Sequence, residues 1–253
     1  MLYNASVNGL EVQAFFPDDD VRSIYIPLLR RLTALYEEKK SRVIVFLAAP
    51  PGAGKSTLAA FLADLSEKTE DVKSVQAAGM DGFHYPQAYL DTHSCLRGGK
   101  EVLLADIKGA PESFDLEKLA EAVKRLRCQN TVLWPEYSRQ THDPVENAYT
   151  VDGDIVLLEG NYLLLRAPGW SELRTCADYT VMLRADEQLV RKRLIARKMS
   201  GGYLSREAAV RHVENSDLYN YRTVVTSSAE ADLVIEAPAG NSRMKKSKIV
   251  KTG

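Results

Sequence analysis

The sequence predicts an α/β fold around a parallel sheet, because strand-length apolar runs alternate with helical patterns along its 253 residues. Most of these runs are continuous and rich in Val, Ile or Leu, as expected for strands that are buried on both faces. Five or six of them are enough for one sheet with helices on both faces. The runs are 43–48, 75–80, 131–134, 154–158, 179–183 and 232–235.

Helical patterns fill most of the intervals between the apolar runs. Residues 21–40 carry aliphatic side chains at helical spacing, which predicts an amphipathic helix. The stretch from 81 to 113 is polar and Gly-rich, and irregular segments of that length are usually functional or disordered. Further helices are expected directly after residue 57 and over 115–128, 187–199 and 205–227.

Composition and charge exclude several classes of function. A formal net charge of −1 gives no general attraction to nucleic acid or to an anionic membrane surface. The three cysteines are widely spaced and form no C-x-x-C pair, so we expect neither a disulfide framework nor a zinc site. Residues 1–20 lack the features of a signal peptide, and no stretch approaches a membrane span. These features predict a cytoplasmic protein.

A phosphate-binding loop follows the first predicted strand of the sheet. The segment Ala49–Thr57 reads A-P-P-G-A-G-K-S-T and leads into a helical stretch, which is the strand, loop and helix order of a Walker A motif. Glycines there let the backbone wrap phosphate groups, and N–H groups at the start of the helix supply positive dipoles. The predicted nucleotide contacts are Gly52, Ala53, Gly54, Lys55, Ser56 and Thr57.

The loop predicts ATP and Mg²⁺ as cofactors. Lys55 can reach the β- and γ-phosphates, and Ser56 can offer its hydroxyl to Mg²⁺. The chain has no N-K-x-D guanine-reading motif, which argues against GTP. Ala49 takes the place of the motif's first glycine, and the two prolines after it offer no N–H, so the donors must follow them.

Three further features favour a kinase over other proteins with a phosphate loop. Asp81 ends an apolar run at the sheet edge where ligands bind, and it can accept a hydroxyl proton, although an Asp there can also be a turn or helix cap. Glu159 ends another run, as does the Walker B acid that holds magnesium. Arg193 and Arg197 precede a Gly-Gly pair, as in a lid that closes over a phosphoryl group, or simply as a solvated basic face.

Several segments make the chain similar to a known family. Met80–His84, Lys108–Asp115, Pro135–Arg139 and Leu158–Tyr162 follow the phosphate loop in the family's order. The chain resembles the phosphoribulokinase, uridine kinase and bacterial-type pantothenate kinase family of P-loop phosphotransferases over roughly residues 41–236. The resemblance implies a P-loop NTPase fold with a small lid.

The resemblance also implies roles for single residues. It makes Asp81 the catalytic base and a neighbour of the metal site, Glu159 a magnesium-site residue, and Tyr137 and His142 part of the acceptor pocket. The full candidate sets are Asp81, Lys55, Arg193 and Arg197 for catalysis, Ser56, Glu159 and Asp81 for magnesium, and His84, Tyr137, Arg139 and His142 for the substrate.

The sequence leaves the identity of the acceptor open. Two of the segments look like pantothenate kinase, the Tyr137-to-His142 spacing looks more like uridine kinase, and other motifs are similar to a nucleoside- or sugar-kinase-like subgroup. Arg139 stands where pantothenate kinase has histidine, and its guanidinium suits a carboxylate or phosphate on the acceptor. The alternative is that Arg139 pairs with Glu136 or Asp143.

These expectations divide the chain into an N-terminal extension with a helix (1–40), a kinase domain (41–238) and a basic tail (239–253) that we expect to be disordered. Within the domain, 84–113 is expected as an acceptor-side insertion and 191–205 as the lid. The expected partner is a small-molecule phosphate acceptor, and we expect no binding to nucleic acid or membrane. Whether the chain forms a homodimer is left open. The competing hypothesis is a nucleotide-binding switch or slow NTPase without a small acceptor.

Overall fold

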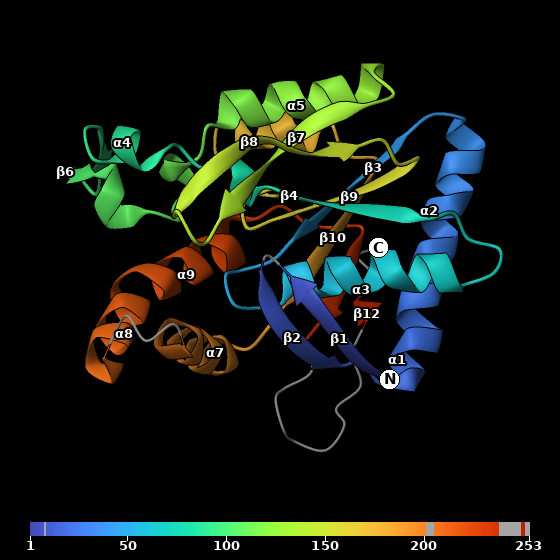
Figure 1. Cartoon of the computed structure of the whole chain (residues 1–253), viewed down its shortest axis with the longest axis horizontal. Coiled ribbons are helices and arrows are strands. Elements are labelled where there is room, and N and C mark those ends of the chain that lie inside the picture. The colour runs from blue at the N-terminus through green and yellow to red at the C-terminus, as the bar shows by residue number, and fades with distance from the viewer. Residues whose placement is uncertain (8, 201–204, 238–248, 251–253) are drawn as a thin grey trace.

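The computed structural model describes residues 1–7, 9–200, 205–237 and 249–250, and a six-stranded sheet lies at its centre (Figure 1). Five of its strands run parallel, in the order β11, β10, β3, β9 and β4. The short β12 pairs antiparallel with β11. The predicted α/β fold with a parallel sheet is confirmed. The strands are β3 (Val43–Ala48), β4 (Val75–Gly79), β9 (Ile155–Gly160), β10 (Tyr179–Arg184), β11 (Leu233–Glu236) and β12 (Ile249–Val250).

Alternate residues of the central strand β3 contribute to two cores, one on each face of the sheet. Val43, Val45 and Leu47 pack with helices α2, α3 and α7, and the residues between them pack with α5 and part of α9. All six residues of β3 are therefore buried, which is why the strand reads as a continuous apolar run. The helices are α2 (Ile26–Lys39), α3 (Lys55–Lys68), α5 (Leu116–Cys128), α7 (Glu187–Ser200), α8 (Arg206–His212) and α9 (Leu218–Ser227).

The predicted helices are present, with local irregularities at two of them. The first begins earlier than expected, as α1 (Asp18–Asp20) and a π-helical turn (Val21–Tyr25) that continue into α2. A second π-helical turn (Val213–Asp217) joins α8 to α9 within the helix predicted over 205–227. None of the helices in the described ranges combines the length and the apolar character that a membrane span requires.

One predicted strand lies outside the central sheet. The run 131–134 was expected there, but β7 (Val132–Ser138) pairs antiparallel with β8 (Asp143–Val151) in a separate hairpin. Its burial alternates at first, with Leu133 exposed between two buried neighbours, as in a strand that is covered on one face only. The sequence interpretation treated a short apolar run as a fully buried strand, and this assignment was wrong.

The predicted insertion and tail are only partly as expected. Residues 84–113 contain α4 (Gln87–Leu90) and a hairpin of β5 (Ser94–Arg97) and β6 (Lys100–Leu103), where no regular structure was predicted. In the tail, Ile249–Val250 forms β12, and the other positions from 239 onward lie outside the described residues. Residues 201–204 of the predicted lid lie outside them as well. The remaining short elements are α6 (Trp170–Arg174) and 3-10 turns at Asp81–Phe83, Leu104–Ile107 and Pro111–Ser113.

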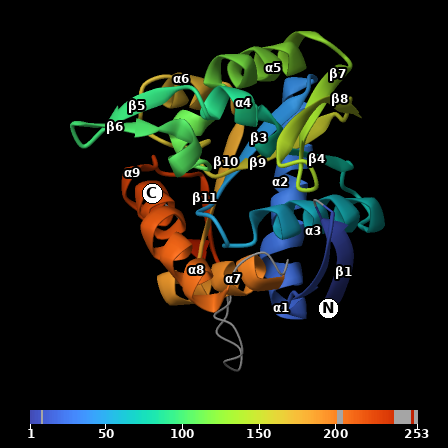
Figure 2. The same cartoon turned by 60° about the vertical axis from the view of Figure 1, so that its left-hand side comes forward.

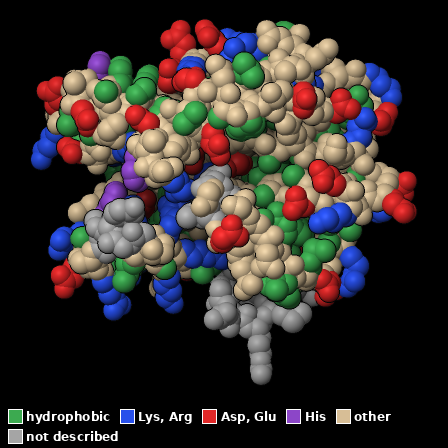
Figure 3. Space-filling view, in the orientation of Figure 1, with side chains coloured by type: hydrophobic (Ala, Val, Ile, Leu, Met, Phe, Trp, Pro, Cys, Tyr) green, Lys and Arg blue, Asp and Glu red, His purple; other side chains and the backbone are tan. Residues whose placement is uncertain are grey.

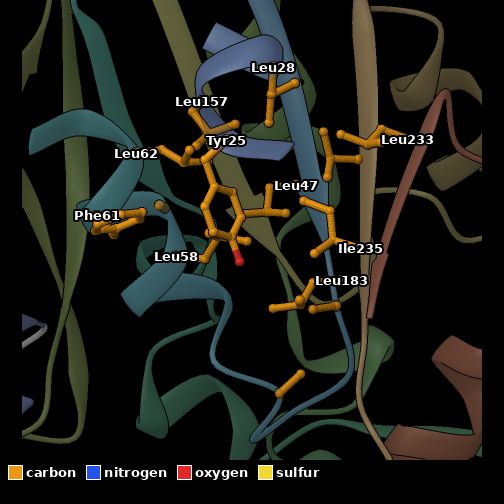
Figure 4. Packing of buried hydrophobic residues seen from close by; sticks show 14 of the residues in the cluster. Tyr25, Leu28, Leu47, Leu58, Phe61, Leu62, Leu157, Leu183, Leu233 and Ile235 are labelled. Atoms are coloured by element: carbon orange, nitrogen blue, oxygen red, sulfur yellow. The ribbon is translucent and has the colours of Figure 1, made fainter. Parts of the chain in front are cut away.

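The N-terminal extension is part of the core. In it, β1 (Leu2–Val7) pairs antiparallel with β2 (Leu10–Phe15) as a hairpin, which the sequence did not predict. Phe61 of α3 stacks on Phe16 with 3.7 Å between ring centroids, and Tyr3 and Tyr25 contact Phe61 edge-on. Figure 4 shows Tyr25 and Phe61 within the packed cluster that also holds Leu47 of β3.

We expect Phe61→Ala to lower the free energy of unfolding by about 3–5 kcal/mol, because it removes a buried ring that joins α3 to the extension. Urea unfolding at neutral pH measures this loss. Phe15→Ala is the matched control, since Phe15 is 61% exposed and should change stability by no more than about 0.5 kcal/mol. Equal losses in the two variants would contradict the packing role of Phe61.

Candidate active site

The loop between β3 and α3 has the backbone conformation of a phosphate cradle. Gly52 and Gly54 have φ angles of 75° and 102°, in the left-handed region that favours glycine. Gly54 is the residue directly before α3, so the free N–H groups of the first helical turn open onto the loop. A helix start of this kind attracts anions through its N–H groups and its dipole.

Helix α7 packs directly against this loop. A Cβ atom on Gly52 would lie 2.9 Å from Leu194 Cγ of α7, so the loop and the helix approach too closely for a larger residue. Arg193 of α7 donates a hydrogen bond from Nη1 to the Ala53 carbonyl at 3.0 Å. Of the other cations on the helix, Arg191 pairs with Glu214 and Lys198 with Asp217. The structure therefore brings Arg193 to the phosphate loop, whereas Arg191 and Lys198 pair with acidic residues of the turn between α8 and α9.

A buried carboxylate lies beside the loop. Glu159, at the end of β9, is 5% exposed and accepts a hydrogen bond from Ser56 Oγ at 2.6 Å. Lys55 Nζ is 3.5 Å from its Oε2 atom, which has no hydrogen-bond partner among the described residues. Burial raises the pKa of Glu159, the Lys55 charge opposes that shift, and the Asp81 charge adds to it.

The donor set at Glu159 suits magnesium. Mg²⁺ prefers hard oxygen ligands and is usually held by one or two carboxylates together with phosphate oxygens and water. The Ser56 hydroxyl and the Oε2 atom of Glu159, which accepts no hydrogen bond in the described residues, are ligands of this kind. No group of three or more His, Cys, Asp or Glu side chains in the described part of the chain could hold a metal on its own. An ion here would therefore need nucleotide oxygens as well.

A close backbone contact fixes the position of Asp81. Asp81 opens the 3-10 turn that follows β4, and the Met80 N–H donates to the Glu159 carbonyl at 2.9 Å. A Cβ atom on Gly82 would lie 2.2 Å from the Pro135 carbonyl oxygen, so only glycine lets β7 pass this close. The turn places the Asp81 carboxylate at the carboxyl edge of the sheet, where ligands bind in open α/β folds.

The Asp81 carboxylate lies among positive charges. Burial raises its pKa, but the charges of Lys55, His84, Arg139 and Arg197 outweigh burial and hold the pKa of Asp81 below 3.8. Asp81 is therefore ionised at neutral pH. In that state it can accept a hydrogen bond, and then a proton, from a hydroxyl group that approaches it.

One cavity of about 230 Å³ is lined by Ser56, Glu159 and Asp81 together. It lies between the start of α3, the edge strand β4 and the β7–β8 hairpin. Figure 3 shows Lys, Arg and His side chains in the hollow between this hairpin and the helices α7 and α8. The polar groups that line the cavity include Ser6, Ser56, Asp81, Glu136, Arg139 and Glu159.

The predicted substrate residues occupy different places around this cavity. Tyr137 and Arg139 line it. The ring of His84 lies between Phe114 and Tyr137, with centroid distances of 3.9 and 5.1 Å. The side chain of His142 is not part of the lining; its carbonyl accepts hydrogen bonds from Tyr137 Oη at 3.0 Å and from Lys108 Nζ at 2.8 Å.

Arg139 forms neither of the ion pairs that the sequence left open. Within the described ranges it pairs with neither Glu136 nor Asp143, and Asp143 accepts a hydrogen bond from the Gln87 N–H at 2.7 Å. Arg139 is an exposed cation on the cavity wall, and it faces Asp81 and Arg197 electrostatically. Its charge is therefore available to a ligand.

Sequence reasoning missed three residues of the site. Tyr149 of β8 lines the cavity, and its Oη accepts the Gly79 N–H at 3.2 Å; burial raises its pKa to about 12. Lys108 donates to Gln87 Oε1 at 2.7 Å and lies 5.4 Å from the Tyr137 ring centre. Ser6 comes from the N-terminal hairpin. Of these three, only Lys108 could have been found from the sequence, because it lies in the segment Lys108–Asp115 that resembles the family.

Known proteins of one kinase family are similar to this chain over most of its length. A model of the Phosphoribulokinase / Uridine kinase family matches residues 44–242. The uncharacterized protein YggC of Escherichia coli strain K12 is 38% identical over 237 residues, which are 93% of this chain and 95% of that protein. A pantothenate kinase of Lactiplantibacillus plantarum is 29% identical over 208 residues, 73% of this chain and 64% of that enzyme.

A solved structure is similar in both sequence and fold. It comes from Silicibacter sp. TM1040, and its designation as a fructose transport system kinase is provisional. The TM-score is 0.68 at 32% identity, over 80% of this chain and 98% of that one. The named relatives therefore differ in the acceptor that their names suggest.

We expect Glu159→Gln to change how stability depends on pH. Burial raises the pKa of Glu159 above 4.5, so from pH 4.5 up to that higher value the folded protein binds a proton that the unfolded chain releases. The free energy of unfolding should fall as pH rises through this window, by up to about 1.4 kcal/mol per pH unit from this group. Glutamine stays neutral and removes this contribution.

Urea unfolding at a series of mildly acidic pH values, without magnesium or nucleotide, measures the two slopes. Glu117→Gln is the matched control, because Glu117 is exposed on α5 and lies outside the site. The same pH slope in wild type and Glu159→Gln would show that the buried carboxylate does not titrate as the structure implies.

Proposed function

The chain belongs to the Phosphoribulokinase / Uridine kinase family, and from that premise we propose that it transfers the γ-phosphate of ATP to a hydroxyl group of a small metabolite. The observation that carries this proposal is the ionised Asp81 in the same cavity as Ser56 and Glu159. A nucleotide switch needs the phosphate loop and the magnesium residues, but it does not need a carboxylate that can take a proton from an acceptor.

In the proposed reaction, the loop N–H groups and Lys55 hold the β- and γ-phosphates of ATP. Ser56 and Glu159 would hold Mg²⁺, with Asp81 as a neighbour; the ion neutralises phosphate charge when it is bound. Asp81 accepts the proton of the acceptor hydroxyl as the oxygen of that hydroxyl bonds to phosphorus and the bond to ADP breaks. Positioning and electrostatic stabilisation supply most of the rate enhancement in such transfers.

Two arginines of α7 are proposed to offset the charge of the transferred phosphoryl group. Arg193 already contacts the phosphate loop through the Ala53 carbonyl, and the charge of Arg197 acts on Asp81. Both lie on a helix that packs against the loop through Leu194. Movement of this helix would therefore carry both charges toward or away from the phosphates.

We further propose that the acceptor carries a carboxylate or phosphate group. Arg139 has no carboxylate partner within the described residues, and Lys108 is held by the neutral oxygens of Gln87 and His142. A cation without an ion-pair partner on the wall of the cavity, as Arg139 is, favours an anionic ligand, and a guanidinium binds such a group through two parallel hydrogen bonds. His84 and Tyr137 would contact the rest of this acceptor.

Asp81→Asn is expected to retain Mg·ATP binding and to lower acceptor-dependent turnover by about a hundred- to ten-thousandfold, because asparagine cannot take the proton. The assay follows ADP formation without acceptor and then with pantothenate, nucleosides, sugars, sugar phosphates and glycerate. Titration with ATP checks binding in the variant.

Two results of this assay would count against the proposal. Turnover by Asp81→Asn at the wild-type rate would exclude Asp81 as the base. Appreciable turnover by wild type that no compound increases, and for which no phosphorylated product is found, would favour a slow NTPase or switch over a kinase.

Arg139→Ala is expected to raise the KM for an anionic acceptor by at least about tenfold and to leave the KM for ATP unchanged, since it removes a charged hydrogen-bond donor from the acceptor side only. Arg30→Ala is the matched control, because it removes the same charge from the exposed side of α2. An unchanged acceptor KM in Arg139→Ala would refute the anionic acceptor and leave the kinase assignment intact.

A further inference from the structure

We propose that the N-terminal β1–β2 hairpin is the outer wall of the acceptor pocket and that Ser6 on this wall is a specificity-determining residue for the small metabolite. This inference rests on the proposed kinase function. It extends the site beyond the part of the chain that the family model matches, which begins at residue 44.

Strand β1 lies beside α3, and its later residues lie nearer the start of that helix. Tyr3 Oη donates to Asp64 Oδ2 at 2.9 Å, and its ring packs on Phe61. Farther along β1, Ser6 lines the same cavity as Ala60 and Ser56, which lie closer to the start of α3. Figures 1 and 2 both show β1 alongside α3. The strand therefore carries Ser6 to the cavity that holds the proposed base.

The hairpin closes a gap that the central sheet leaves open. Strand β4 is the edge strand of the sheet, so no further strand of that sheet lies beyond it in the described residues. Ala59 and Ala60 of α3 and Ala77 and Gly79 of β4 line the cavity with small groups, which leaves space between the helix and the strand. Ser6 is the one residue from the described part of the extension in this lining.

Two neutral hydroxyl groups, those of Tyr149 and Ser6, line the cavity beside its charged groups. Gly79 donates its N–H to Tyr149 Oη, which leaves the Tyr149 proton without an acceptor among the described residues. The Ser6 hydroxyl likewise forms no hydrogen bond within them, and its side chain is exposed. A hydroxyl, carbonyl or amide group of the acceptor fits between such groups. Arg139, on the same cavity, would take the anionic group of that acceptor.

The β1–β2 hairpin is fixed to the helix that begins at the phosphate loop. The stacking of Phe16 on Phe61 and the hydrogen bond from the Met1 amino group to the Phe16 carbonyl at 2.7 Å tie both strands of the hairpin to α3. Helix α3 itself begins at the phosphate loop, whereas the proposed lid cations lie on α7. The hairpin is therefore placed to select acceptors by size before any movement of the lid.

The test places a large side chain at position 6, where it would occupy part of the cavity. Ser6→Trp is expected to raise the acceptor concentration needed for half-maximal transfer by about tenfold or more and to leave the KM for ATP within about twofold. Asn4→Trp is the matched control, because Asn4 is exposed on the same strand and does not line the cavity. The probe is γ-labelled ATP with the low-molecular-mass fraction of a bacterial extract, scored by labelled product that is not a nucleotide.

Each outcome decides between the two proposals. If wild type labels a product and Ser6→Trp needs no more extract than Asn4→Trp, the wall is refuted while the kinase function stands. If wild type labels no product, the kinase function fails and this inference fails with it. Should Ser6→Trp not bind Mg·ATP, Ser6→Ala decides instead: a rise of about two- to tenfold supports the contact, and no rise overturns it.

Discussion

The burial of the Glu159 carboxylate beside Lys55 and Ser56 is the interaction on which the rest of the site depends. A buried charge is costly unless it is paired and hydrogen-bonded, so the phosphate loop and β9 must stay in register. The pairing of Leu47 with Glu159 on one side and of Gly79 with Glu159 on the other supplies this register. The same pairing brings the end of β4, and with it the proposed base, to the phosphate loop.

The electrostatic arrangement around this carboxylate has two parts. On the nucleotide side, Lys55 and the start of α3 supply positive charge, and Glu159 offers oxygen to a cation. On the acceptor side, cations outnumber Asp81, and their combined charge keeps it ionised despite burial. Asp81 can therefore take a hydroxyl proton at neutral pH, and the cations are available to the phosphates of ATP and to the anionic group proposed for the acceptor. This arrangement supports the proposed phosphoryl transfer to a small acceptor over hydrolysis in open solvent.

The sequence predicted the parts of the site that local order determines. The loop and Asp81 follow mostly apolar strands and Glu159 lies near the end of another, and parallel strands bring their carboxyl ends to one edge of the sheet. Tyr149 and Ser6 could not be found in this way, because both lie on half-exposed hairpin strands whose partners are set by tertiary packing. The run 131–134 was wrongly assigned to the central sheet for the same reason: a short apolar run does not reveal whether one face of its strand is covered or both.

The proposed phosphate site and the proposed acceptor site depend on different elements of this chain. The phosphate groups are proposed to bind where β3, α3 and β9 meet, and their register leaves little freedom there. The cavity proposed to hold the acceptor is bounded on its outer side by the β7–β8 hairpin and by Ser6 of the β1–β2 hairpin, at the edge beyond β4. Changes in these hairpins can reshape the cavity without moving the phosphate loop. Relatives with different acceptors in their names can therefore share one phosphate site, and the acceptor of this chain has to be inferred from its hairpins.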